Sequence, residues 1–295
     1  TAEEIRIPVP WGYIAGKRWG EKTGQPLIAL HGFLDNLSTF DKLLPLLDVP
    51  SVLCLDLNGH GQSSHLPKGI SIYYSDYLIQ LRYLFKHLYV WDKDLVFMGH
   101  SFGSSLLFTY AALYPEEVSK MINIDCSRYR TAAVVKKMVK DTRRSMDTFL
   151  STENHYKFST FTFDECVNFV DKERKSFDLG ISMESCKILV SRGTSNIGNG
   201  KYYFTHDSRL GAHAFGRNTA SYNLALASRI KCQVLNVHAS GGVNVNAFGL
   251  EEDKHIKMMN ENCKSCLNLV LEGGHHIHLE SPEVVAPHIN KFLNS

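Results

Sequence analysis

The chain has 295 residues, of which 44% are hydrophobic and 21% charged, a globular balance that excludes a disordered chain, a collagen-like fibre and a disulfide-stapled miniprotein. Lys and Arg number 32 against 30 Asp and Glu, so the net charge of +2 gives no electrostatic reason to expect nucleic acid or an anionic membrane as a partner. No run of 18 apolar residues is present, so we predict no membrane span.

The first part of the chain alternates predicted strands with predicted helices. After a hairpin at Ile5–Val9 and Tyr13–Trp19, buried strands are expected at Leu27–Leu30, Val52–Asp56, Leu95–Met98 and Met121–Ile124. Helices are expected between these strands at Phe40–Leu47, Asp76–Tyr89 and Ser105–Tyr114. This alternation predicts an α/β fold with a mostly parallel sheet covered by helices on both faces.

The pattern changes between Ser127 and Ser228, where helical patches such as Val134–Phe149 and polar turns replace the alternation. It returns with a strand, a helix, a strand and a last helix at Gln233–Val237, Asp253–Glu261, Leu267–Leu271 and Pro282–Leu293. We therefore predict one sheet interrupted by a helical insertion. Residues 1–126 and 229–295 form the predicted core, and residues 127–228 form the insertion.

A candidate nucleophile lies between a predicted strand and a predicted helix. Residues 99–103 read Gly-His-Ser-Phe-Gly, a G-x-S-x-G motif. In this context the motif is typical of a nucleophile elbow, whose tight turn holds a serine in a strained backbone conformation at a helix N-terminus. The turn needs small residues on both sides. Ser101 is therefore the candidate nucleophile.

The segment after Leu27–Leu30 offers the candidate oxyanion hole. It reads His31-Gly32-Phe33. In this architecture an oxyanion hole has two donors, a backbone N–H just after that strand and the N–H of the residue that follows the nucleophile. The two candidate donors are the amides of Phe33 and Phe102. Such amides stabilise the negative charge that develops on a carbonyl oxygen under attack.

The candidate base follows the last predicted strand. Gly274 is followed by three histidines, His275, His276 and His278. His275 comes directly after the strand exit and follows the serine in chain order, so it is the candidate base. We expect the other two to be packing or polar neighbours. Asp56, in a D-x-x-G-x-G-x-S turn, is expected to be structural.

Four segments stand in the order and spacing of the α/β-hydrolase fold: LIALHGFLDN, LDLNGHGQSS, FMGHSFGSSL and GGHHIHLESPE. The sequence resembles this fold over nearly its whole length. Two stretches resemble a narrower group, the serine hydrolase-like proteins, which include kraken. They are HGFLDNLSTFDKLLPLL and ILVSRGTSNIGNG. The resemblance implies that Ser101 is the nucleophile, that His275 is the base, and that residues 127–228 are a cap over the site. It implies hydrolysis of an ester or similar acyl bond of a small molecule through an acyl-enzyme, with no metal or organic cofactor.

The acid partner of His275 is the main departure from that pattern. Many relatives carry it in the loop after the strand that here is Gln233–Val237, but residues 232–250 contain no Asp or Glu. Asp125 ends a neighbouring predicted strand, and dehalogenase-type relatives use a carboxylate at the equivalent strand end. Glu251 and Asp253 are alternatives, although both also suit the first turn of a helix. An incomplete triad is the remaining alternative.

A second class of function stays open at this point, because a fold does not fix an activity. The alternative is a ligand-binding or receptor-like protein that keeps the fold with slow or no turnover. Epoxide hydrolases and haloalkane dehalogenases need a carboxylate nucleophile, and Ser101 argues against both.

The seven cysteines are odd in number and spread along a long chain, so a disulfide framework is not expected. Residues 1–10 also lack the charged and apolar regions of a signal peptide. We therefore expect reduced thiols in a cytoplasmic or organellar interior rather than secretion. Cys263 and Cys266 form a C-x-x-C, which we interpret as two ordinary thiols rather than a redox pair or half a zinc site.

Overall fold

The computed structural model describes residues 2–88, 93–126, 128, 135–154, 159–177, 179–212, 219–243 and 249–295. One sheet contains β1 (Ala2–Val9), β2 (Gly12–Gly20), β3 (Leu27–Leu30), β4 (Ser51–Leu55), β5 (Leu95–His100), β6 (Val118–Ile124), β9 (Gln233–Gly241) and β10 (Ser265–Gly274). Their spatial order is β1-β2-β4-β3-β5-β6-β9-β10. The first two strands are antiparallel to their neighbours, and all other pairs are parallel.

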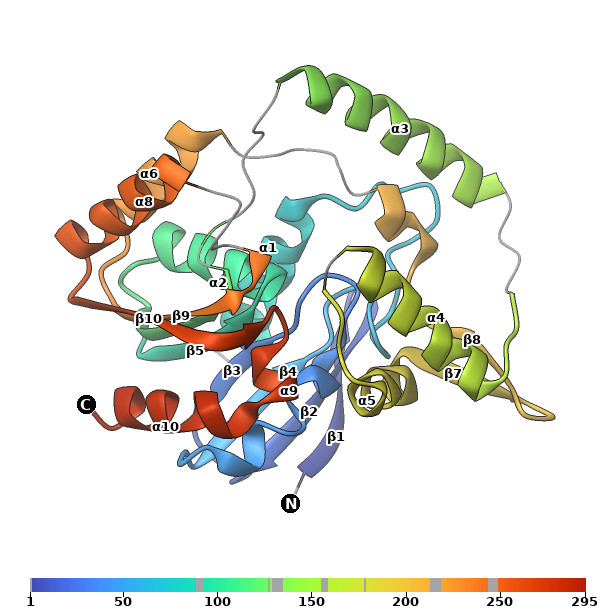
Figure 1. Cartoon of the computed structure of the whole chain (residues 1–295), viewed down its shortest axis with the longest axis horizontal. Coiled ribbons are helices and arrows are strands. Elements are labelled where there is room, and N and C mark those ends of the chain that lie inside the picture. The colour runs from blue at the N-terminus through green and yellow to red at the C-terminus, as the bar shows by residue number, and fades with distance from the viewer. Residues whose placement is uncertain are drawn as a thin grey trace.

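Helices cover both faces of this sheet (Figure 1). One face packs against α1 (Tyr74–Tyr83), α2 (Phe102–Leu113), α6 (Ala220–Ala227) and α8 (Gly249–Asn262). The other packs against α9 (Ile277–Glu280), α10 (Pro282–Leu293) and the 3-10 turns η1 (Leu37–Phe40) and η2 (Leu44–Leu46). The central strands β3 and β4 are buried throughout, because successive side chains point to opposite faces and helices cover both. In β3, for example, Ile28 packs on one face and Ala29 on the other. The predicted α/β-hydrolase fold with a mostly parallel sheet is confirmed.

The predicted insertion contains α3 (Val135–Asn154), α4 (Phe163–Ser176), α5 (Met183–Gly193) and η4 (Ser208–Ala212). It also contains an antiparallel hairpin, β7 (Thr194–Gly198) and β8 (Lys201–Phe204), which sequence reasoning missed. Figure 1 shows α4, α5 and the hairpin gathered at one side of the molecule, whereas α6 lies beside α8 and packs against α2 and α8. The domain division at residues 127–228 stays a prediction.

Two predicted helices differ from the observed elements. The expected helix at Phe40–Leu47 is replaced by the short turns η1 and η2, and η2 has a proline in its first turn. The expected helix at Asp76–Tyr89 is α1, which passes into a π-helical turn, η3 (Leu84–Leu88). Among the described helices, none has both the length and the apolar character needed to cross a bilayer.

All seven cysteines are free thiols in the structure. Cys263 and Cys266, the two cysteines of the C-x-x-C, are both half-buried. We expect alkylation of the unreduced, denatured protein followed by mass analysis to find seven labelled cysteines. A native bridge between these two residues, or a stoichiometric zinc ion, would contradict that expectation.

Candidate active site

Ser101 lies in a sharp turn between β5 and α2, with a backbone φ of 51°. This conformation is strained for a residue with a side chain. The two flanking glycines are required by space. A Cβ on Gly99 would overlap the backbone of Ser104, and a Cβ on Gly103 would overlap the carbonyl of Leu30 in β3. The G-x-S-x-G sequence therefore forms a tight strand-to-helix turn that presents Ser101 at the N-terminus of α2.

His275 meets a carboxylate on the neighbouring part of the sheet. Its Nδ1 lies 2.5 Å from Oδ2 of Asp125, which follows β6. Because an ionised carboxylate only accepts, Nδ1 carries the hydrogen and Nε2 is left free to act as a base. Burial lowers the pKa of His275, and the hydrogen bond to Asp125 offsets part of that effect. The structure thus brings two of the sequence-predicted residues together.

The end of β9 and the residues that follow it bind Asp125. The N–H of Ala239 donates to Oδ1 at 2.9 Å, and the N–H of Val243 donates to Oδ2 at 3.0 Å. Gly242 faces the same carboxylate so closely that a Cβ there would overlap it. The segment that lacks an acid therefore binds the carboxylate that follows the adjacent strand β6. The alternatives Glu251 and Asp253 lie in α8, and their side chains fall outside the described part of the chain.

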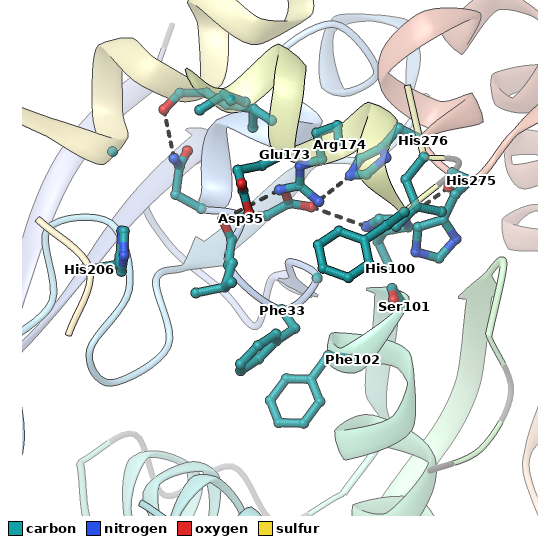
Figure 2. Close-up of a pocket in the computed structure, with 18 of the residues that line it drawn as sticks. Phe33, Asp35, His100, Ser101, Phe102, Glu173, Arg174, His206, His275 and His276 are labelled. Carbon is teal, nitrogen blue, oxygen red and sulfur yellow. Dashed lines mark hydrogen bonds and ion pairs between the residues drawn. The ribbon is translucent and has the colours of Figure 1, made fainter. Parts of the chain in front are cut away.

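Phe33 and Phe102, the residues with the candidate oxyanion amides, lie side by side. Their rings pack edge to face with centroids 5.7 Å apart. Figure 2 shows both rings at the lower centre of the view, with Ser101 and His275 together to their upper right. Leu34, the next residue of this loop, has a φ of 59°. The loop after β3 and the N-terminus of α2 thus converge where Ser101 is presented.

A cavity of about 540 Å³ joins these residues. Its lining from the core includes Phe33, Ser101, Phe102, Asp125 and His275. Its lining from the predicted insertion includes Phe169, Val170, Arg174, Leu189, Val190 and Phe204. Elements α4, α5 and β8 therefore roof the candidate site. Sequence reasoning placed a cap here but named none of its lining residues.

A family model described as the α/β hydrolase fold matches residues 25–282. The chain belongs to the α/β-hydrolase-fold family. A "Probable serine hydrolase" of Drosophila melanogaster is 38% identical over 99% of this chain and 87% of its own length. "Serine hydrolase-like protein 2" of Homo sapiens is 29% identical, over 98% of this chain and 93% of its own. These names support hydrolase activity for this α/β hydrolase.

Solved structures agree with the family assignment. A hypothetical protein of Pseudomonas aeruginosa superposes with a TM-score of 0.82 and 26% identity, covering 99% of this chain and 100% of that one. A thioesterase domain from the curacin biosynthetic pathway superposes with a TM-score of 0.80 and 22% identity, covering 100% of both chains. The second similarity shows the shared fold alone.

Sequence reasoning missed a charged centre beside the site of this α/β hydrolase. Asp35, buried in the loop after Phe33, forms an ion pair with Arg174 of α4. His276 Nε2 donates to the same carboxylate at 3.1 Å, and His100 Nδ1 lies 3.5 Å from it. Burial opposes ionisation, but the Arg174 guanidinium holds the pKa of Asp35 well below its usual range. Figure 2 shows Asp35 and Arg174 above Phe33, with His100 and His276 to their right.

The residues around Asp35 connect the nucleophile turn, the His275 loop and the roof. His100 precedes Ser101, and its Nε2 donates to the carbonyl of His275 at 2.9 Å. His276 follows His275, and Arg174 belongs to the roof. The "D" of HGFLDN was visible in the sequence, but its partner in α4 carries no local signal. Burial lowers the pKa of His276 to about 3, so its imidazole is neutral.

Asp35, His100 and His276 also place three metal-ligating atoms within 4.8 Å of one another. The fit to a metal ion is poor, because the Arg174 cation already neutralises Asp35 and opposes a second positive charge. Asp56 makes structural contacts instead, accepting from Leu37 N–H at 2.8 Å and from Arg192 Nε at 2.8 Å. His278 packs in the core and contacts Thr39.

Proposed function

We propose that this protein is a serine esterase that acts through an acyl-enzyme on Ser101. The observation that carries the proposal is the contact between His275 Nδ1 and Asp125 Oδ2, in the same cavity as Ser101. That contact fixes the imidazole with Nε2 unprotonated, as a general base requires. The proposed oxyanion donors are the N–H groups of Phe33 and Phe102.

The chemistry runs in two halves. His275 Nε2 takes the proton of the Ser101 hydroxyl while the oxygen attacks the ester carbonyl, and the two amides stabilise the oxyanion that forms. The intermediate collapses, and the alcohol leaves with the proton from Nε2. Water then attacks the acyl group, gives a proton to Nε2, and the acid is released as the proton returns to Ser101. Asp125 stabilises the imidazolium formed in each half.

The test combines labelling with turnover. We expect a fluorophosphonate probe to modify Ser101, located by peptide mass analysis, and p-nitrophenyl esters to be hydrolysed in a steady state. The receptor-like alternative makes a different prediction, in which a ligand binds without steady turnover. A protein that neither reacts with the probe nor hydrolyses any ester would refute the proposed function.

The pH dependence follows from His275. A general base must be neutral, so kcat/KM rises with pH as the imidazolium of the free enzyme loses its proton. Because burial lowers the pKa of His275 from its ordinary value of 6.5, we expect the midpoint of the acid limb below pH 6.5. Asp125→Asn removes a contribution that raises this pKa, so its residual activity should show a midpoint at still lower pH. An acid limb centred above pH 6.5 would contradict the assignment.

A further inference from the structure

Much of the cavity wall away from Ser101 is apolar and aromatic. Phe169 of α4 packs against Phe204 of β8, with ring centroids 5.3 Å apart, and Phe204 packs against His206. All three line the cavity, together with Leu189 and Val190 of α5. Figure 2 places His206 at the opposite side of the pocket from Ser101. A chain attached to Ser101 therefore has an apolar path beneath the roof.

The charges around the cavity do not suit an anionic acyl group. Among the described residues that line it, Arg174 is the single Arg or Lys, and its guanidinium is paired with Asp35. Glu173, beside it on α4, is exposed and also lines the cavity. Burial lowers the pKa of His206, so this imidazole supplies no positive charge at neutral pH. A substrate carboxylate would thus enter without a counter-ion.

The opening of the cavity has a mostly apolar rim. Residues that line the cavity and are also exposed mark this opening. Four residues do both: Glu173 and three apolar residues, Leu34, Phe169 and Phe177, with exposed fractions of 46%, 45% and 69% for the apolar three. Large exposed apolar side chains around a pocket are typical of a surface that binds an apolar ligand. The apolar path from Ser101 therefore continues to the surface.

From these three observations we infer that the substrate is an uncharged ester of a medium-chain fatty acid, whose chain crosses the aromatic wall and reaches the rim formed by Leu34, Phe169 and Phe177. The inference rests on the proposed esterase function. A cavity of about 540 Å³ lies within the range of roughly 300 to 1,000 Å³ that holds drug-sized ligands, so an acetyl group would leave most of it unfilled.

The first experiment compares p-nitrophenyl acetate, butyrate and octanoate below their micellar concentrations. Each fully buried methylene contributes about 4-fold to transition-state binding. Octanoate has four more methylenes than butyrate, so kcat/KM should rise by at least about 10-fold, and by about 250-fold if all four are fully buried. The effect of a negative charge on the acyl chain is tested by comparing kcat/KM for p-nitrophenyl hemisuccinate and p-nitrophenyl pentanoate. The pentanoate has an acyl chain of similar length with a neutral end. We expect the hemisuccinate to be slower by about 100-fold or more.

The second experiment removes one side chain of the rim. Phe177→Ser should lower the ratio of octanoate to acetate kcat/KM by about 10-fold, mainly through KM for octanoate. The matched control is Val270→Ser, an equally exposed apolar residue on β10 that does not line the cavity, with an exposed fraction of 65%. This control should leave the ratio unchanged.

The outcomes separate the two proposals. Fluorophosphonate labelling of Ser101 with faster hydrolysis of acetate than octanoate, or with hemisuccinate as good as pentanoate, overturns the substrate inference and leaves the esterase proposal standing. Equal effects of Phe177→Ser and Val270→Ser overturn the role of the rim. Failure of Ser101 to react with the probe, with no hydrolysis of any ester, overturns both.

Discussion

Replacing Ser101 by alanine should lower kcat for ester hydrolysis by about 10⁴- to 10⁶-fold, because the attacking oxygen is lost while binding contacts and the oxyanion amides remain. The protein should fold normally, since the Ser101 backbone N–H still donates to the carbonyl of Ile124. The variant should also lose the fluorophosphonate label. Steady-state kinetics with p-nitrophenyl octanoate, thermal unfolding and intact-mass analysis measure these effects.

The matched control for this change is Ser191→Ala, a serine exposed on α5. It should retain normal turnover and the label, which separates the loss of one hydroxyl at the elbow from any general effect of the substitution. Undiminished hydrolysis by the Ser101 variant would remove this residue from the mechanism.

Asp125→Asn should lower kcat by about 10⁴-fold, because the histidine is left in the wrong tautomer. An amide nitrogen in place of Oδ2 donates a hydrogen bond, so His275 accepts through Nδ1 and carries its proton on Nε2, where it cannot take the proton of Ser101. The same exchange leaves the N–H of Val243 without its acceptor. We therefore also expect a stability loss of about 1 to 3 kcal/mol.

Asp56→Asn is the matched control, because Asp56 is an equally buried carboxylate that accepts from the backbone and from Arg192. It should lower the melting temperature while kcat of the folded protein stays within about 10-fold of the parent. Equal losses of kcat in the two variants would mean that Asp125 acts only as a structural acid. Full activity of Asp125→Asn would show that His275 needs no carboxylate at this position.

The sequence was sufficient for parts of the site that depend on local backbone geometry. An apolar strand followed by G-x-S-x-G can turn in few ways, because Gly99 and Gly103 have no room for a side chain. The position of Asp125 followed from topology rather than from a motif. Its strand, β6, lies between β5, which leads to Ser101, and β9. Parallel strands open on one edge, so the end of β6 faces the same site.

The roof could not be predicted in the same way. Residues of α4 and α5 divide their apolar side chains between a small core of their own, which includes Cys166 and Cys186, and the wall of the cavity. Because each helix has apolar residues on two faces, its sequence lacks the clear 3.6-residue spacing of apolar residues on which a sequence-based assignment depends. The Arg174–Asp35 ion pair joins residues 139 positions apart, and neither end has a local pattern that points to the other.

The backbone around the candidate site stores free energy that the rest of the fold must offset. Leu34, Ser101 and Asp125 all have left-handed φ angles, at 59°, 51° and 49°. Each such residue costs on the order of 1 to 3 kcal/mol. Glycine adopts this conformation without strain, so selection for heat resistance alone would favour glycine at Leu34 and Ser101. At Asp125 the carboxylate also accepts two backbone hydrogen bonds that glycine would lose. Thermostable variants obtained in that way would lose the side chains of the site, which sets activity and stability against each other at this edge of the sheet.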